Sequence, residues 1–179
     1  MTHDHRWYAL RVRPRAEWMV QANLRNKGYD LLLPTYKSRR RWSDRIKVLE
    51  MPLFPGYVFC RFDSRTRLPI LMTPGVLFVV GIGKTPHPVE DSEIAALQQV
   101  MESGLTCAPH PYLTVGQRVR VEHGSLAGLT GIVTHLKNEL RLIISVNLLM
   151  RSVSVEIDHA WVEPINETPS RTQFLAKPS

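Results

Sequence analysis

The stretch LTCAPHPYLTVG, residues 105–116, divides the sequence into two parts with different patterns. It contains two prolines, few large apolar residues and neither a helical nor a strand period, which is typical of a linker. Strand-like and helix-like segments alternate before it, whereas only strand-like segments follow it. We therefore predict one domain over residues 1–104, a linker over 105–114, a second domain over 115–165 and a disordered polar tail over 166–179.

The first part reads as a small α+β sandwich, an antiparallel sheet with flanking helices. Apolar residues alternate over residues 7–12, and a helical stripe follows that Gly28 ends. Short strands are predicted over residues 29–33, from Gly56, and after the Pro74-Gly75 turn. A second helix is expected from about Glu90 to Gly104. The order of elements is therefore β-α-β-β-β-α.

The second part is predicted to be all strand. Alternating segments lie at residues 118–123, 129–136, 140–148, 151–158 and 160–164. Five short strands with tight connections over about 50 residues predict a small SH3-like barrel.

Positive charge is concentrated in one short segment. The chain has a net charge of +7, and residues 37–47 (KSRRRWSDRIK) hold six cations and one acid. Neither period is present, which indicates a loop or an exposed hairpin, and Tyr36 and Trp42 could stack on bases. The segment is either a solvated loop or a patch that binds phosphates, and its uneven charge favours nucleic acid. The candidate nucleic-acid-binding residues are Arg13, Arg15, Lys37, Arg39, Arg40, Arg41, Arg45 and Lys47.

The segment FPGYVFC, residues 54–60, is apolar on both faces of its predicted strand. Tyr57 and Phe59 share one face, and Val58 and Cys60 share the other. A sheet with helices on one side needs only one apolar face. Either helices cover both faces, or one face is a binding patch for a partner.

Features of catalysis are weak, and we expect no enzyme, cofactor or metal. GIGKT at residues 81–85 lacks the first glycine of a P-loop, because that position is Phe78 within an apolar run where we expect burial. We interpret it as a strand-to-helix connector with Lys84 solvated. The triplet His3-Asp4-His5 lies at a fraying terminus, and Cys60 reads as a small buried hydrophobe. No membrane span or secretory signal is visible, so a cytoplasmic protein is expected.

Several motifs together resemble one family. PLFPGYVF at residues 52–59, VGIGKTPHPVEDSEIAAL at 80–97 and the opening Trp7-Tyr8 resemble the N-terminal domain of NusG-type transcription elongation factors. VGQRVRVEHGSLAGLTGIV at 115–133 resembles a KOW motif, and RSVSVEIDHAWVEPI resembles the end of the family's barrel. The basic hairpin is more similar to the specialised RfaH-like and UpxY-like antiterminators, whereas residues 62–76 depart from the polar motif of RfaH.

The resemblance implies a function. A bacterial factor of this kind binds the clamp helices of RNA polymerase, contacts DNA in the elongation complex and suppresses pausing or termination. The implied polymerase-binding residues are Trp7, Tyr8, Phe54, Tyr57, Phe59 and Ile82. The KOW domain would recruit a ribosomal protein or Rho, and a monomer is expected. A ribosome-associated KOW-type RNA-binding module is the alternative.

Overall fold

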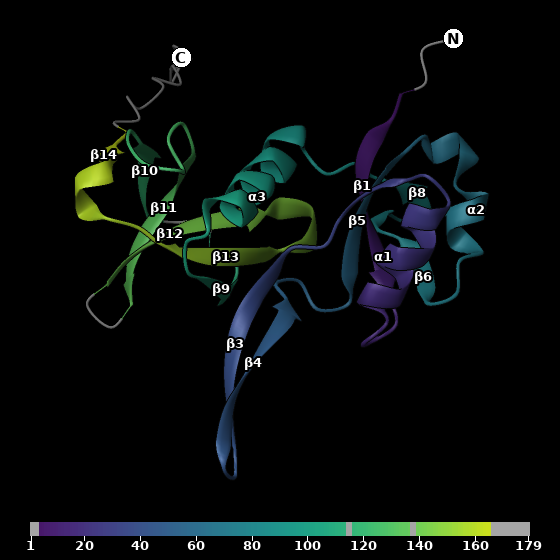
Figure 1. Ribbon diagram of the computed structural model, residues 1–179. Coiled ribbons are helices and arrows are strands. Elements are labelled where there is room, and N and C mark those ends of the chain that lie inside the picture. Colours follow the sequence, from purple (N-terminus) through teal and green to yellow (C-terminus); the bar gives the residue numbers. More distant parts are fainter. Residues whose placement is uncertain (1–3, 114–115, 137–138, 166–179) are drawn as a thin grey trace, which may run out of the picture.

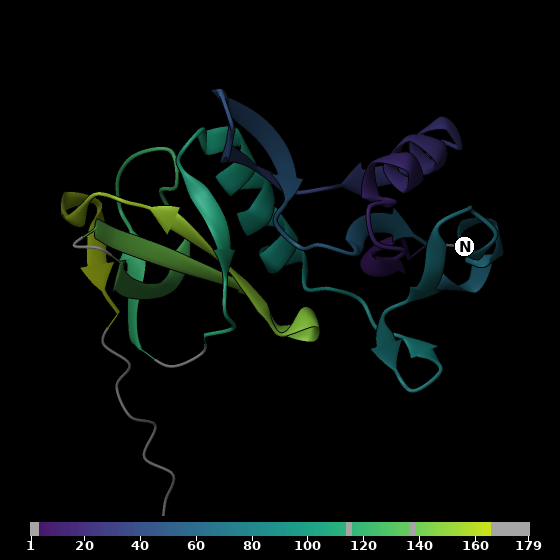
Figure 2. The same ribbon diagram turned by 90° about the horizontal axis from the view of Figure 1, so that it is seen from below.

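The computed structural model describes residues 4–113, 116–136 and 139–165. Two antiparallel sheets lie at either side of helix α3 (Asp91–Ser103), and a two-stranded hairpin projects from the body (Figure 1). The same arrangement is visible from below in Figure 2. The predicted fold class is confirmed, because an α+β half is followed by an all-β half, although the strand pairings of the described residues do not close the C-terminal sheet into a barrel.

The N-terminal sheet has the strand order β2-β5-β1-β6. Its strands are β1 (Arg6–Val12), β2 (Asp30–Leu32), β5 (Tyr57–Phe62) and β6 (Val76–Val79). Strand β5 pairs antiparallel with both β1 and β2, so the FPGY segment begins a central strand. Phe59 on one face of β5 and Val58 on the other belong to two different buried clusters, which explains why this segment has no polar face.

One face of the sheet packs against α1 (Glu17–Asn26) and the short helix α2 (Leu68–Leu71). Val58 and Cys60 of β5 meet Val20 and Leu24 of α1 in one buried cluster. The opposite face belongs to a second cluster, in which Ala9 and Phe59 join apolar residues of α3 and of the C-terminal sheet. Helices alone therefore cover only one face, and the C-terminal half of the chain takes part in covering the other.

The basic segment forms a hairpin of β3 (Thr35–Trp42) and β4 (Arg45–Pro52). It pairs with no strand of either sheet and points away from both (Figure 1). The 3-10 helix η1 (Ser64–Thr66) follows β5. Of the two predicted alternatives, a loop or an exposed hairpin, the structure has the hairpin.

The connector after β6 forms a second, very small hairpin, β7 (Gly81–Ile82) and β8 (Thr85–Pro86), with exposed Lys84 in its turn. The expectation that Phe78 is buried is wrong, because its side chain is 53% exposed. Strand β6 is at the sheet edge, and an irregularity in its register with β1 leaves Leu77 and Phe78 facing outward.

Helix α3 begins after Glu90 and ends at Gly104, as predicted. Gly104 has φ +69°, the left-handed conformation that terminates helices without a Cβ clash. Glu90 caps the helix without a side-chain hydrogen bond, so the first turn relies on Asp91 and Glu93 for its favourable charge. The apolar stripe of α3 includes Ile94, Leu97 and Val100, all buried.

The C-terminal sheet has the order β14-β10-β11-β12-β13-β9. Five of its strands match the predicted ones: β10 (Gln117–Val121), β11 (Thr130–Leu136), β12 (Glu139–Val146), β13 (Arg151–Glu156) and β14 (Val162–Pro164). Short 3-10 helices, η2 (Asn147–Leu149) and η3 (His159–Trp161), connect them. The sixth strand, β9 (Cys107–His110), lies within the predicted linker and pairs with β13. The predicted tail lies outside the described residues.

Candidate functional site

The residues Phe54, Tyr57 and Phe59 form what we call the aromatic surface. The rings of Phe54 and Phe59 meet edge to face, with centroids 5.7 Å apart, and both side chains are buried. Tyr57 is half-buried beside them. The intervening turn depends on Gly56, whose φ of +83° is unfavourable for a residue with a side chain.

A buried carboxylate holds this turn. Oε1 of Glu17, in the first turn of α1, accepts a hydrogen bond of 2.8 Å from the backbone N–H of Gly56. Glu17 is only 5% exposed, so the bond forms away from competing water. Helix α1 thereby fixes the start of β5 and the position of Tyr57.

The C-terminal sheet reaches the aromatic surface through Arg151. Its guanidinium carbon lies 5.6 Å from the centre of the Tyr57 ring, and that of Arg11 from β1 lies 4.8 Å from it. Guanidinium groups at these distances are attracted by the ring's quadrupole. Tyr57 is therefore contacted both by its own sheet and by the opposite half of the chain.

Two polar side chains of α3 bind the connections between strands of the C-terminal sheet. Oε1 of Glu93 accepts hydrogen bonds from the backbone N–H (3.1 Å) and the side-chain amide (2.7 Å) of Asn147. Nε2 of Gln99 donates to the carbonyl oxygens of Ser125 and Ala127, both at 3.1 Å. Burial raises the pKa of the Glu93 carboxyl above its usual value, and the bonds from Asn147 partly offset that shift.

The structure places the six implied polymerase-binding residues in three environments. Trp7, Phe54, Tyr57 and Phe59 all belong to the large cluster that includes the C-terminal sheet. Tyr8 is on the opposite face of β1, where its ring lies 4.7 Å from that of Phe62 in the α1 cluster. Ile82 is 70% exposed on the small β7–β8 hairpin.

The β3–β4 hairpin has two chemically different faces, because directly paired residues share a face. One face, here called the aliphatic face, carries Lys37, Arg39, Arg41, Ile46, Val48 and Glu50. The other, here called the tryptophan face, carries Ser38, Arg40, Trp42, Arg45, Lys47 and Leu49. Trp42 is 55% exposed, and the ammonium of Lys47 lies 5.5 Å from the centre of its ring.

All eight candidate nucleic-acid-binding residues are exposed, and they occupy two places. Six of them lie on the hairpin, shared between its two faces. Arg13 and Arg15 lie in the turn between β1 and α1, which is separate from the hairpin in both views (Figures 1 and 2). The structure thus does not join those two arginines to the hairpin patch.

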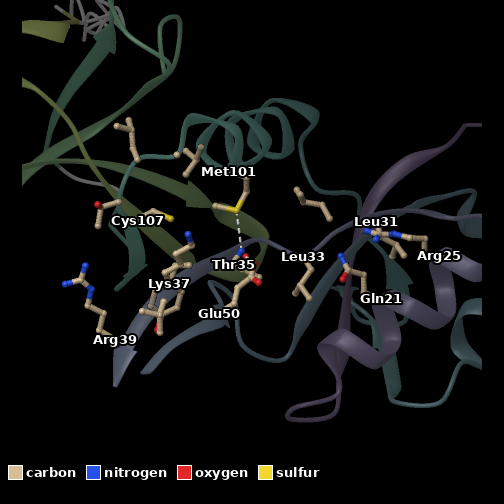
Figure 3. A pocket seen from close by; sticks show the side chains of 17 residues that line it. Gln21, Arg25, Leu31, Leu33, Thr35, Lys37, Arg39, Glu50, Met101 and Cys107 are labelled. Carbon is tan, nitrogen blue, oxygen red and sulfur yellow. Dashed lines mark hydrogen bonds between the residues drawn. The ribbon is translucent and has the colours of Figure 1, made fainter. Parts of the chain in front are cut away.

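A groove of about 1300 Å³ runs along the base of the hairpin. Its walls come from α1, β2, the hairpin, the C-terminal end of α3 and β9. Figure 3 shows Lys37 and Arg39 at one end and Gln21 and Arg25 at the other. The backbone N–H of Thr35 donates to the sulfur of Met101 at 3.3 Å and so ties the hairpin base to α3.

The described residues contain no candidate metal site. No group of three or more metal-ligating side chains is present among them, and His3 lies outside the described part. The prediction for Cys60 is confirmed: its side chain is fully buried, and burial raises the pKa of the thiol to about 12. Across residues 4–113, 116–136 and 139–165, no helix has both the length and the apolar character that crossing a bilayer requires.

Sequence reasoning missed the residues that cover and hold the aromatic surface. Glu17, Gln99 and Arg151 read as ordinary exposed polar residues, since their partners are distant in the chain. For Glu17 the sequence offered a signal of burial, because the residues next to it in the first turn of α1 are apolar. For Arg151 the sequence offers none.

An α+β unit with a β unit docked on its aromatic surface, and with a projecting basic hairpin, has the architecture of a two-part macromolecule-binding protein. The chain belongs to the NusG family. The family model described as "Transcription termination factor nusG" matches residues 5–98, which is more than half of the chain.

The relatives are bacterial transcription termination/antitermination proteins. The NusG of Helicobacter pylori (strain ATCC 700392 / 26695) is 29% identical over 175 residues, covering 89% of this chain and 98% of its own. The NusG of Thermus thermophilus is also 29% identical, covering 87% and 96%. That of Escherichia coli K12 is 27% identical, covering 88% and 95%. Both halves of the chain thus match NusG together, which does not favour the ribosome-associated alternative.

A solved structure has the same fold. It concerns domain interaction in Thermotoga maritima NusG, and the two structures superpose with a TM-score of 0.59 at 21% identity. The match covers 90% of this chain and 98% of the other.

Proposed function

We propose that the chain is a non-catalytic transcription elongation and antitermination factor. Its aromatic surface binds the clamp helices of RNA polymerase, its hairpin contacts DNA in the elongation complex, and the result is suppression of pausing or termination. Membership of the NusG family supports the general role. The single observation that carries the polymerase contact is Tyr57, a half-buried aromatic that Arg151 of the C-terminal sheet covers.

Around Tyr57 itself the cover consists of polar contacts that a partner can replace, whereas apolar packing among Phe59, α3 and the C-terminal sheet holds the two halves together. A cation–π contact and a few side-chain hydrogen bonds contribute about 1 kcal/mol each. Aromatic side chains in partly covered pockets are also the residues that dominate protein interfaces. Polymerase binding therefore requires the C-terminal sheet to move off the aromatic surface, after which the helices of the polymerase take its place.

Tyr57→Ala tests the polymerase contact. We expect the variant to bind core RNA polymerase at least about ten-fold more weakly than the unchanged chain, because an interface anchor is lost. Phe59→Ala is unsuitable, since Phe59 is fully buried and its truncation costs about 3–5 kcal/mol of folding stability.

Tyr29→Ala is the matched control, because Tyr29 is also half-buried but packs against the opposite cluster. Co-purification and a titration with core polymerase measure binding, and thermal unfolding checks the fold. Equal polymerase affinity for Tyr57→Ala and the unchanged chain would contradict the proposal.

A further inference from the structure

The aliphatic face of the hairpin has a composition that nucleic acid does not explain. Ile46 is 69% exposed and Val48 is 55% exposed, and they are paired directly with Arg41 and Arg39. Arginine and lysine suit phosphates, but exposed branched aliphatic side chains have no favourable contact with a phosphate backbone. Single-stranded nucleic acid is held by cations together with aromatic rings. That combination is found on the tryptophan face.

The aliphatic face continues into the groove at the hairpin base. Lys37, Arg39, Val48 and Glu50 of this face line the groove, whose floor includes Leu31 and Leu105. Apolar side chains at intervals with cations between them therefore run from the middle of the hairpin to the groove. From Thr35 to Arg41 the strand spans about 20 Å, enough for some four turns of a helix.

Charge complementarity defines what this surface accepts. Lys37, Arg39 and Arg41 lie on the aliphatic face, and Arg25 lies at the far end of the groove. Glu50 is the one acid on this face, and its Oε1 accepts a 2.6 Å hydrogen bond from the hydroxyl of Thr35. A partner thus meets cations on the hairpin and at the far end of the groove, with apolar side chains between them.

We propose that the aliphatic face and the groove dock an acidic polypeptide segment that carries a row of apolar side chains, while the tryptophan face binds single-stranded nucleic acid. The hairpin then holds two ligands on opposite faces. Carboxylates of the segment pair with Arg39 and Arg41, and its apolar side chains cover Ile46, Val48 and the groove floor. This surface does not include Tyr57, but β9 contributes one wall of the groove and belongs to the C-terminal sheet, so the complete groove exists only while that sheet lies on the aromatic surface.

Two labelled probes and two variants of the full chain test this assignment. One probe is a 20-residue helical peptide with glutamate on one side and leucine along the other, and the second is a 12-nucleotide oligo-dT. The first variant combines Ile46→Ser with Val48→Ser, which removes the aliphatic groups without changing net charge. The matched variant, Trp42→Ser, alters the opposite face. All three side chains are exposed, so both variants keep the fold.

Fluorescence anisotropy at constant salt gives the affinities. We expect Ile46→Ser/Val48→Ser to weaken peptide binding about ten-fold and oligo-dT binding less than two-fold. Trp42→Ser is expected to weaken oligo-dT binding about five-fold or more and to leave the peptide unaffected. A peptide with serine in place of leucine must bind weakly to every form of the chain.

Three results would overturn the proposal. The first is a loss of oligo-dT binding in the Ile46→Ser/Val48→Ser variant as large as the loss of peptide binding, which assigns both faces to nucleic acid. The second is equal binding of the leucine and serine peptides, which leaves only charge attraction. The third is no peptide binding by the unchanged chain.

Discussion

Gly56 and Glu17 determine where the aromatic side chains are held. A Cβ added to Gly56 would lie 2.3 Å from Nη1 of Arg11, and its φ of +83° already excludes most residues. The N–H of Gly56 then finds its acceptor in Glu17, which reaches it from α1. Turn conformation and helix position are thus linked through one buried hydrogen bond. The identity of residue 17 therefore matters for the position of the aromatic surface, although Glu17 itself is almost fully buried.

Replacement of Glu17 by alanine tests that link. We expect Glu17→Ala to lower the free energy of unfolding by about 1–3 kcal/mol, because the buried N–H of Gly56 loses its partner. Glu17→Gln keeps an acceptor oxygen at the same place and should lose less. Chemical denaturation monitored by circular dichroism measures both. A Glu17→Ala variant as stable as the unchanged chain would show that the turn does not depend on this bond.

At the scale of elements, β9 shows how a linker can become part of a sheet. The backbone N–H of Glu156 donates to the carbonyl of Thr106, so hydrogen-bonded pairs alternate from that point along β9 and β13. Ala108 pairs with Ser154 in a hydrogen-bonded position, and Pro109 falls opposite Val153 where no N–H is required. The edge of β13 is thereby covered by the chain segment that joins the two halves.

Ala108→Pro should detach β9, because it removes the N–H that this register assigns to Ser154. We expect faster hydrogen exchange at Ser152 and Ser154 and a loss of about 1–3 kcal/mol of local stability, whereas exchange in β10 and β11 stays unchanged. Ala108→Ser retains the N–H and serves as the control. Unaltered protection of Ser154 in the proline variant would contradict the pairing.

Much of the fold could be predicted from local patterns in the sequence, whereas β9 and the exposure of Phe78 could not. Alternation predicted β1 and the strands β10 to β14, and the helix expected from about Glu90 to Gly104 is α3, since those signals are local. It failed for β9, because Pro109 and the lack of a period hide a strand whose pairing partner is some 45 residues away. It also failed for Phe78, because an apolar run does not reveal that its strand lies at an edge. For the candidate site, the sequence predicted that both faces of FPGYVFC are apolar, but it did not predict which residues cover these faces.

At the scale of the whole molecule, α3 is the element that both halves share. Its apolar stripe belongs to the cluster that contains Ala9 and Phe59 of the N-terminal sheet and Val153 of the C-terminal sheet. Its polar residues Glu93 and Gln99 bind the C-terminal half directly. Separation of the two halves must therefore uncover apolar surface on α3. The burial of this surface stabilises the arrangement in which the C-terminal sheet lies on the aromatic surface, here called the closed arrangement. Mutation of the polar contacts can change that stability while both hydrophobic clusters stay intact.

Glu93 makes the closed arrangement dependent on pH. Burial raises the pKa of Glu93 in the closed arrangement, so closing favours the protonated carboxyl. Its contribution to closure is therefore present at acidic pH and is lost as pH rises through the raised pKa. Glu93→Gln keeps an oxygen for the two bonds from Asn147 but removes the partly buried charge. We expect this variant to be closed about two- to five-fold more than the unchanged chain at pH 7, because partial exposure reduces the effect.

Small-angle X-ray scattering in a pH series that begins below the ordinary glutamate pKa of 4.5 and ends above neutrality measures the separation of the halves through the radius of gyration. The unchanged chain should expand as pH rises, whereas Glu93→Gln should change little. Glu102→Gln is the control, because Glu102 lies exposed on the same helix and should retain the expansion. Since the closed arrangement covers Tyr57, Glu93→Gln should also bind polymerase more weakly at pH 7. Identical expansion in the Glu93→Gln variant and the unchanged chain would show that the titrating group lies elsewhere.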